Sequence, residues 1–143
     1  MQLTHSTDLA LRVLMLTAAR ESLITIRELA ETLEVPATHM AKIVQRLQHL
    51  DLVVTTRGRA GGVHLAPDTR PRRVGQIVRA LEGPGEVIDC DAPPCPLRGA
   101  CRLRGALRQA QESFLVSLDS VALADLVGPP TGPALLSLGP ARH

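Results

Sequence analysis

Three cysteines fall within twelve residues, in the segment Cys-Asp-Ala-Pro-Pro-Cys-Pro-Leu-Arg-Gly-Ala-Cys that runs from Cys90 through Cys95 to Cys101. An odd number of thiols in a chain with no recognisable secretion signal argues against a structural disulfide. Structural zinc favours closely spaced Cys-x2-Cys or His-x3-His pairs, which this segment lacks. Its prolines and Gly99 make a stiff irregular loop, and soft thiolates suit iron–sulfur clusters. The segment therefore favours an iron–sulfur site, with structural zinc as the alternative.

The composition limits which elements can hold these thiols. The chain has 143 residues, the size of one domain, and 45% of them are apolar. Phe114 is the only aromatic residue, so the core must be aliphatic. The N-terminus lacks a basic region, Asp8 and Arg12 interrupt its apolar run, and no stretch reaches the roughly 18 apolar residues of a membrane span. We expect a soluble, cytoplasmic protein with no membrane segment.

The net charge of +2 hides an uneven distribution. Residues 38–73 carry seven basic and two acidic side chains, a local charge of +5. Residues 80–143 carry five basic and seven acidic ones, a local charge of −2. A basic segment followed by a mildly acidic one indicates a polyanion-binding part and a separate assembly or sensing part.

A helix-turn-helix pattern occupies the segment before and within the basic region. Thr25 and Glu28 have capping-box spacing and open one helix, and Pro36 breaks it. A third helix begins near Thr38. Its apolar positions recur at helical spacing, at Met40, Ile43, Val44, Leu47 and Leu50. Its other face is polar and basic, as in a recognition helix, although an ordinary helical hairpin would show the same two-helix pattern.

Two β-prone runs follow, residues 52–56 and 63–65, and the residues between them are rich in glycine and arginine. A hairpin directly after a helix-turn-helix is a wing, and arginines at its tip can enter a DNA minor groove. We therefore predict DNA contacts from the third helix and from the wing tip. The predicted contact residues are Thr38, His39, Lys42, Gln45, Arg46, Arg57 and Arg59.

The remaining segments complete a mainly α fold: a winged helix-turn-helix domain with a small β-hairpin wing and a long C-terminal dimerisation helix. A first helix over residues 7–20 is apolar on nearly every side, and we expect a partner subunit to provide its second cover. Another helix runs from Arg73 to Gly83. After the cysteines, a long helix carries an apolar seam formed by Leu103, Leu107, Ala110, Phe114 and Leu118. The seam is fit for pairing with a copy of itself, and the alternative is that it packs on its own domain.

These elements divide the chain into four parts. Residues 1–83 form the DNA-binding domain, and residues 84–102 form the cluster-binding loop. Residues 103–127 hold the dimerisation helix and a short terminal helix that ends at Gly128. Residues 128–143 are rich in proline and glycine, which predicts a flexible tail.

Several motifs together resemble the winged-helix regulators of the IscR and NsrR superfamily, and within it the nitric-oxide-sensing NsrR type. The resemblance extends to about residue 127, and the first gap between cysteines is about one residue shorter than is usual in that family. The motifs are Leu3-Thr4, Asp8-Leu-Ala-Leu-Arg12, Thr38-His39-x-x-Lys42, Leu47-x-x-Leu50, the glycine-rich wing, Leu81-Glu82-Gly83 and Cys95-Pro-Leu-Arg-Gly-Ala-Cys101.

The resemblance implies a homodimer with one 4Fe-4S cluster per subunit, and it bears on the fourth ligand. IscR-like members use a histidine three residues after the last cysteine, where this chain has Arg104, which cannot bind a metal. NsrR-like members use an aspartate near the N-terminus, donated by the other subunit, and Asp8 stands at that place. His5 is the second choice. The implied ligands are Cys90, Cys95, Cys101 and the Asp8 of the other subunit, with Arg12 as the partner of a released Asp8.

The function implied is that of a repressor that binds palindromic operators and releases them when nitric oxide nitrosylates its cluster. The alternatives are an IscR-like regulator of iron–sulfur cluster supply and a zinc-stabilised winged-helix regulator. An electron-transfer protein would have no use for a DNA-reading domain. The sequence shows no catalytic dyad and no phosphate-binding loop, so we do not expect an enzyme.

Overall fold

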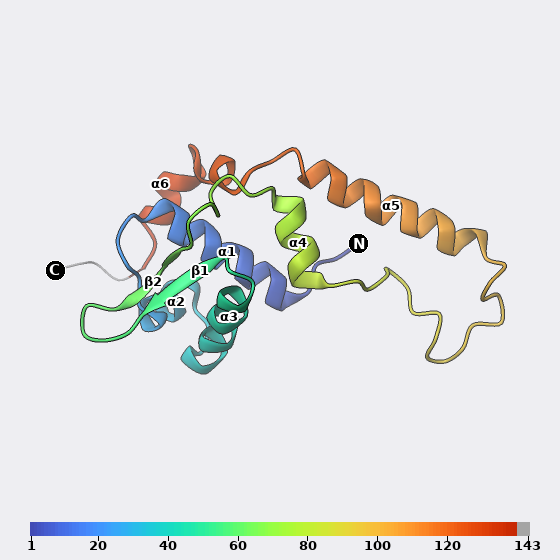
Figure 1. Cartoon of the computed structure of the whole chain (residues 1–143), viewed down its shortest axis with the longest axis horizontal. Coiled ribbons are helices and arrows are strands. Elements are labelled where there is room, and N and C mark those ends of the chain that lie inside the picture. Colours follow the sequence, from blue (N-terminus) through green and yellow to red (C-terminus); the bar gives the residue numbers. More distant parts are fainter. Residues whose placement is uncertain (140–143) are drawn as a thin grey trace.

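The computed structural model describes residues 1–139, and most of them lie in helices (Figure 1). α1 (His5–Ala19) begins where the Thr4 hydroxyl accepts a hydrogen bond from the Thr7 backbone N–H. The Glu82 carboxylate holds this cap, since it accepts from the Thr4 backbone N–H at 2.8 Å. Val13, Leu14 and Leu16 of α1 are fully buried. α1 is therefore the central helix of the core.

The predicted helix-turn-helix is formed by α2 (Ile26–Leu33) and α3 (Ala37–His49). Thr25 caps α2 by accepting from the Glu28 N–H at 3.0 Å, as the capping-box spacing predicts. The turn uses Glu34 in a left-handed conformation, with φ of 57°, and Pro36 then opens α3. The predicted inner face of α3 packs into the core through buried Met40, Ile43, Val44 and Leu47.

The wing is formed by the antiparallel pair β1 (Val53–Thr56) and β2 (Gly62–Leu65). Ile24, just before α2, joins β2 through two backbone hydrogen bonds with Val63, at 2.7 and 3.1 Å. Gly61 is required at the turn, because a Cβ there would collide with the Thr56 carbonyl oxygen. The wing is thus tied to the chain that enters the helix-turn-helix.

A second, smaller core joins α4 (Val74–Glu82) to the C-terminal half of α5 (Arg102–Leu118) through Val74, Val78 and Leu115. Gly75 permits this contact, because a Cβ there would collide with the Asp119 carboxylate and the Leu115 carbonyl oxygen. The other half of α5 and the loop before it project beyond the rest of the molecule (Figure 1). The predicted fold class is confirmed: a mainly helical chain with a hairpin wing and a long helix after the loop.

The C-terminal segment corrects the sequence prediction. The 3-10 helix η1 (Leu123–Val127) ends at Gly128 as expected, but a further helix, α6 (Thr131–Leu136), follows where a flexible tail was predicted. Leu123 and Leu135 are buried in the main core, and both elements pack against α1. The apolar cover of α1 that we assigned to a partner subunit comes from these elements of the same chain. Residues 140–143 of the predicted tail lie outside the described residues.

Among residues 1–139, none of the helices is long and apolar enough to cross a membrane.

Candidate metal centre and nucleic-acid interface

The three cysteines lie on the projecting loop between α4 and α5, at the opposite end of the molecule from α3 and the wing (Figure 1). All three are free thiols; Cys90 is 9% exposed, while Cys95 and Cys101 are half-buried. The Cys95 backbone N–H donates to the Cys90 carbonyl oxygen at 3.0 Å. Cys101 is the N-cap of α5, where its Sγ accepts from the Arg104 backbone N–H at 3.4 Å.

The donor chemistry of this loop fits an iron–sulfur cluster, since it offers three soft thiols and none of them is used in a disulfide. Within residues 1–139, however, no three His, Cys, Asp or Glu side chains of the single chain come together in a group that could hold a metal ion. The three predicted cysteine ligands share a loop but are not gathered around one point, and Asp8 is not brought to them.

Asp8 and Arg12 form the pair that their spacing predicted. Both oxygens of the Asp8 carboxylate accept hydrogen bonds from the Arg12 guanidinium, at 2.9 and 3.0 Å. The two side chains are 42% and 58% exposed on α1. The second-choice ligand, His5, lies instead against His39 of α3, with ring centroids 6.2 Å apart.

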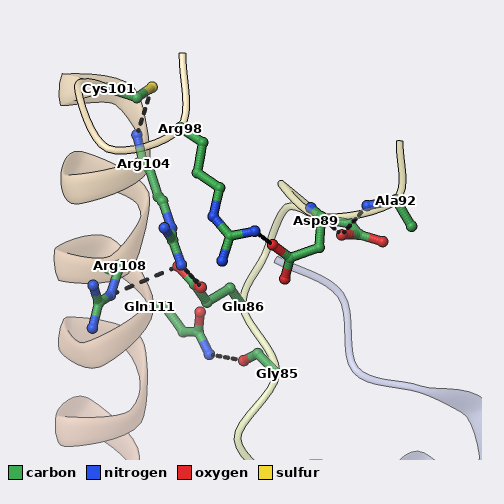
Figure 2. Close-up of polar contacts among 10 residues, drawn as sticks. Gly85, Glu86, Asp89, Ala92, Arg98, Cys101, Arg104, Arg108 and Gln111 are labelled. Atoms are coloured by element: carbon green, nitrogen blue, oxygen red, sulfur yellow. Dashed lines mark hydrogen bonds and ion pairs between the residues drawn. The ribbon is translucent and has the colours of Figure 1, made fainter. Parts of the chain in front are cut away.

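Polar contacts cross the base of the cysteine loop (Figure 2). The Glu86 carboxylate accepts two hydrogen bonds from the Arg104 guanidinium, at 2.6 and 3.1 Å, and Arg108 lies 3.7 Å away. The hydrogen bonds from Arg104 lower the pKa of Glu86, and the pKa of Arg104 is raised in turn. Inside the loop, the backbone N–H groups of Asp91 and Ala92 donate to Asp89 and lower its pKa.

The predicted DNA-contacting surface is exposed at the other end of the molecule. Thr38, Lys42 and Gln45 are exposed on α3, His39 is half-buried beside His5, and Arg57 and Arg59 are exposed at the wing. A groove of about 470 Å³ separates α3 from the wing; Gln45, Gln48 and Arg57 are among its lining residues. Arg46 differs from the others, because its guanidinium donates a hydrogen bond to the Leu81 carbonyl oxygen at the end of α4.

The family is decided by sequence comparison. Residues 3–129 match the family model Rrf2, described as an iron-dependent transcriptional regulator. The HTH-type transcriptional repressor NsrR of Streptomyces coelicolor is 54% identical over 142 residues, which cover 96% of each chain. The chain belongs to the Rrf2 family. It is a transcriptional regulator and a homologue of NsrR, and the expectation that it is not an enzyme is confirmed.

Solved structures share the Rrf2 fold at low sequence identity. CymR (YrzC), the global cysteine regulator of B. subtilis, superposes with a TM-score of 0.70 at 22% identity and covers 88% of this chain and 95% of its own. T. potens IscR superposes with a TM-score of 0.67, also at 22% identity, and covers 89% of this chain and 86% of its own. These likenesses support the winged-helix fold.

Sequence reasoning missed three contacts of this Rrf2 chain: the Glu86–Arg104 pair, the Glu82 contact with Thr4 and the bond from Arg46 to Leu81. Glu82 belongs to the Leu81-Glu82-Gly83 motif, and Arg104 stands three residues after the last cysteine, so both residue types were visible in the sequence. Their partners lie 78 and 18 residues away along the chain. No helical or strand periodicity relates positions so far apart, so the sequence held no signal for these pairs.

Proposed function

We propose that this Rrf2 protein is a homodimeric repressor that holds one 4Fe-4S cluster per subunit, binds palindromic operators in double-stranded DNA and releases them in response to nitric oxide. It would do so in the cytoplasm, where its DNA target lies. The observation that carries the proposal is the set of three free thiols on one projecting loop, in a chain that is 54% identical to the NsrR repressor.

We propose Cys90, Cys95, Cys101 and the Asp8 of the partner subunit as the four ligands. Three cysteines leave one position open, and Arg104, three residues after the last of them, is engaged with Glu86. In the single chain the loop projects away from α1, so an Asp8 ligand is more easily supplied by a second chain (Figure 1). When bound, the cluster supplies a centre with which nitric oxide reacts.

The contact between Asp8 and Arg12 is the arrangement of Asp8 in the cluster-free form of the protein. A carboxylate that loses its metal must find another partner or water, and here the Arg12 guanidinium on the same helix face binds both of its oxygens. Asp8 thus has one arrangement with a cluster and one without. A cluster affects DNA binding only if it binds the DNA-binding form of the protein and the released form with different affinity. The two forms would differ in the partner of Asp8, which is the cluster in one and Arg12 in the other.

The dimer is supported by the exposed residues of the predicted α5 seam. Leu103 is 61% exposed, Phe114 is 36% exposed and Ala110 is also exposed. The other two residues of the predicted seam differ: Leu107 is half-buried, and Leu118 packs against the smaller core of its own chain. A seam of this kind is suited to pairing with its own copy. A symmetric dimer presents two α3 helices for the two half-sites of a palindrome.

The test is anaerobic purification with iron and sulfide analysis, followed by titration with nitric oxide while visible absorption and operator binding are recorded. We expect a coloured protein whose absorption bleaches in parallel with operator release. A colourless protein with one zinc ion per chain overturns the proposal. Asp8→Ala is expected to give a more labile cluster or one of another type, whereas Glu31→Ala, which removes the carboxylate of another exposed i,i+4 pair, with Arg27 on α2, leaves the cluster unchanged.

A further inference from the structure

The two ends of the cysteine loop are fastened to each other by side chains. We call this set of contacts the loop clasp; it consists of Gly85, Glu86, Arg104 and Gln111. Gly85 and Glu86 stand where the chain leaves α4, and Arg104 and Gln111 stand on α5, after the last cysteine. The loop clasp therefore joins the chain before Cys90 to the chain after Cys101 (Figure 2).

The geometry of the loop clasp is that of a strong, directional contact. Arg104 presents Nε and Nη2 to the two carboxylate oxygens of Glu86, at 3.1 and 2.6 Å, which is the fork arrangement of a bidentate ion pair. The Gln111 side-chain amide donates to the Gly85 carbonyl oxygen at 2.8 Å. The Glu86 and Arg104 side chains are 29% and 28% exposed, against 47% and 86% for the surface pair of Glu31 and Arg27.

The other contacts of the loop are local. It contains no helix or strand between Glu82 and Arg102, and its backbone bonds are short-range turns such as that from Cys95 to Cys90. The side-chain contacts within it, from Asp89 to the next residues and between Arg98 and Asp91, do not join its two ends. The side chains that hold α5 against α4 lie in and just after its C-terminal half, at Glu112, Leu115 and Asp119. The first turns of α5, which carry Cys101, are therefore free to swing unless the loop clasp holds them.

Arg104 takes part in the loop clasp and also contacts one of the three thiols. Its backbone N–H donates to the Cys101 Sγ, while its side chain binds Glu86, four residues before Cys90. One residue thus relates the first thiol of the loop to the last. A guanidinium suits this contact, because its planar fork directs two parallel N–H groups at the two carboxylate oxygens, whereas an ammonium has no such fork.

We propose that Glu86 and Arg104 are a positioning pair that sets the separation of Cys90 and Cys101, keeps Cys90 covered and slows the loss of a bound cluster. This inference rests on the proposed cluster-binding function. The pair touches no ligand of the metal through its side chains. Its effect is to close the loop before the metal arrives, which reduces the conformational entropy that binding must overcome.

The first test uses the metal-free protein and measures the alkylation rate of each thiol by mass spectrometry. In the wild type we expect Cys90, the buried thiol, to react most slowly. Glu86→Gln and Arg104→Gln are each expected to raise the Cys90 rate by about fivefold, the scale of a partly exposed ion pair, with an unchanged circular dichroism spectrum. The matched control is Arg102→Gln, which removes an exposed arginine beside Cys101 that is not part of the loop clasp.

The second test uses the reconstituted protein and follows the decay of cluster absorption in the presence of a chelator. Both single variants are expected to lose the cluster about fivefold faster. The exchanged pair Glu86→Arg with Arg104→Glu should recover part of the wild-type rate, and Arg104→Lys should recover less than the exchange. The proposal is overturned if the single variants keep the wild-type rates, or if Arg102→Gln accelerates alkylation and decay as much as Arg104→Gln does. A wild type that binds no cluster contradicts the proposed function instead, while the alkylation test still decides whether the loop clasp covers Cys90.

Discussion

At the scale of single residues, the basic side chains of this protein differ in what their charged groups contact. Lys42, Arg57 and Arg59 are exposed on the DNA-binding end. The Arg46 guanidinium, on the same helix as Lys42, donates to the Leu81 carbonyl oxygen. Charge and position in the sequence would give Lys42 and Arg46 the same role in binding phosphate. Their contacts separate them, because Arg46 also connects α3 to the end of α4.

This difference predicts unequal salt dependence of operator binding. Lys42→Gln should weaken binding and lower the slope of log K against log salt by about one, the value for one lost phosphate contact. Arg46→Gln should change the slope less and instead lower the midpoint of thermal unfolding, since it removes a contact within the protein. Fluorescence anisotropy at several salt concentrations and a thermal melt measure both effects. Equal slope changes with unchanged melts would show that Arg46 acts as a phosphate contact alone.

At the scale of elements, the joint between α4 and α5 depends on close backbone approach at one glycine. Gly75 of α4 faces the Asp119 carboxylate and the Leu115 carbonyl oxygen, with no room for a Cβ. Arg79 strengthens the joint with two hydrogen bonds of 2.9 Å to Glu112. This joint attaches α5, and with it Cys101, to α4 and so to the winged-helix part of the chain.

A pair of glycine substitutions tests the joint. Gly75→Ala should destabilise the protein by about 1–3 kcal/mol, the cost of overpacking a filled contact. Gly105→Ala is the matched control on α5, where a Cβ would meet nothing within 4 Å, and should stabilise by about 0.5–1 kcal/mol through helix propensity. Urea unfolding gives both free energies. If Gly75→Ala is as stable as the wild type, α5 can move away from α4 without cost.

The terminal helix α6 makes a second prediction at this scale. Leu135 is 8% exposed and packs into the main core, whereas its neighbour Leu136 is 55% exposed. Leu135→Ala should lower the free energy of unfolding by about 2 kcal/mol or more through the lost burial and the cavity left behind. Leu136→Ala, with the same change of side chain, should cost far less. Similar values for the two variants would mean that α6 does not cover α1 in solution.

At the scale of the whole molecule, the proposed sensing and DNA-binding parts lie at opposite ends, with α4 between them (Figure 1). The end of α4 contacts α3 through Leu81 and Arg46, and the start of α1 through Glu82 and Thr4. The cysteine loop begins at the next residue, Gly83. A change in the loop would therefore reach α3 and α1 through one short segment, the end of α4.

The predicted dimer gives the test at this scale. Phe114 lies on the exposed seam of α5, and Val116 is exposed on the opposite side of the same helix, at 36% and 54%. Phe114→Glu should weaken self-association by about thirtyfold or more, the scale of an interface hot spot of 2 kcal/mol. Val116→Glu introduces the same charge and should leave it unchanged. Sedimentation equilibrium measures the dissociation constants. If both variants weaken self-association equally, or if neither variant weakens it, the dimer contact lies elsewhere.

Much of the fold and the types of the site residues could be predicted from the sequence, because these features depend on local rules. The capping box at Thr25, the apolar face of α3, the glycine-rich wing and the extent of α5 all follow from contacts between residues a few positions apart. The three thiols and the Asp8–Arg12 pair, with its spacing of one helical turn, are equally local.

Tertiary packing decided the remainder. A segment rich in proline and glycine has little helical tendency of its own, so α6 was predicted as a tail; it is helical because Leu135 is buried against α1. The loop clasp joins side chains 18 residues apart, whose approach depends on where α4 and α5 meet. The sequence alone thus determined which side chains are available for a metal and for DNA. Only the folded chain determined which of them are already engaged with a partner, because pairs distant along the chain meet only after the helices have packed.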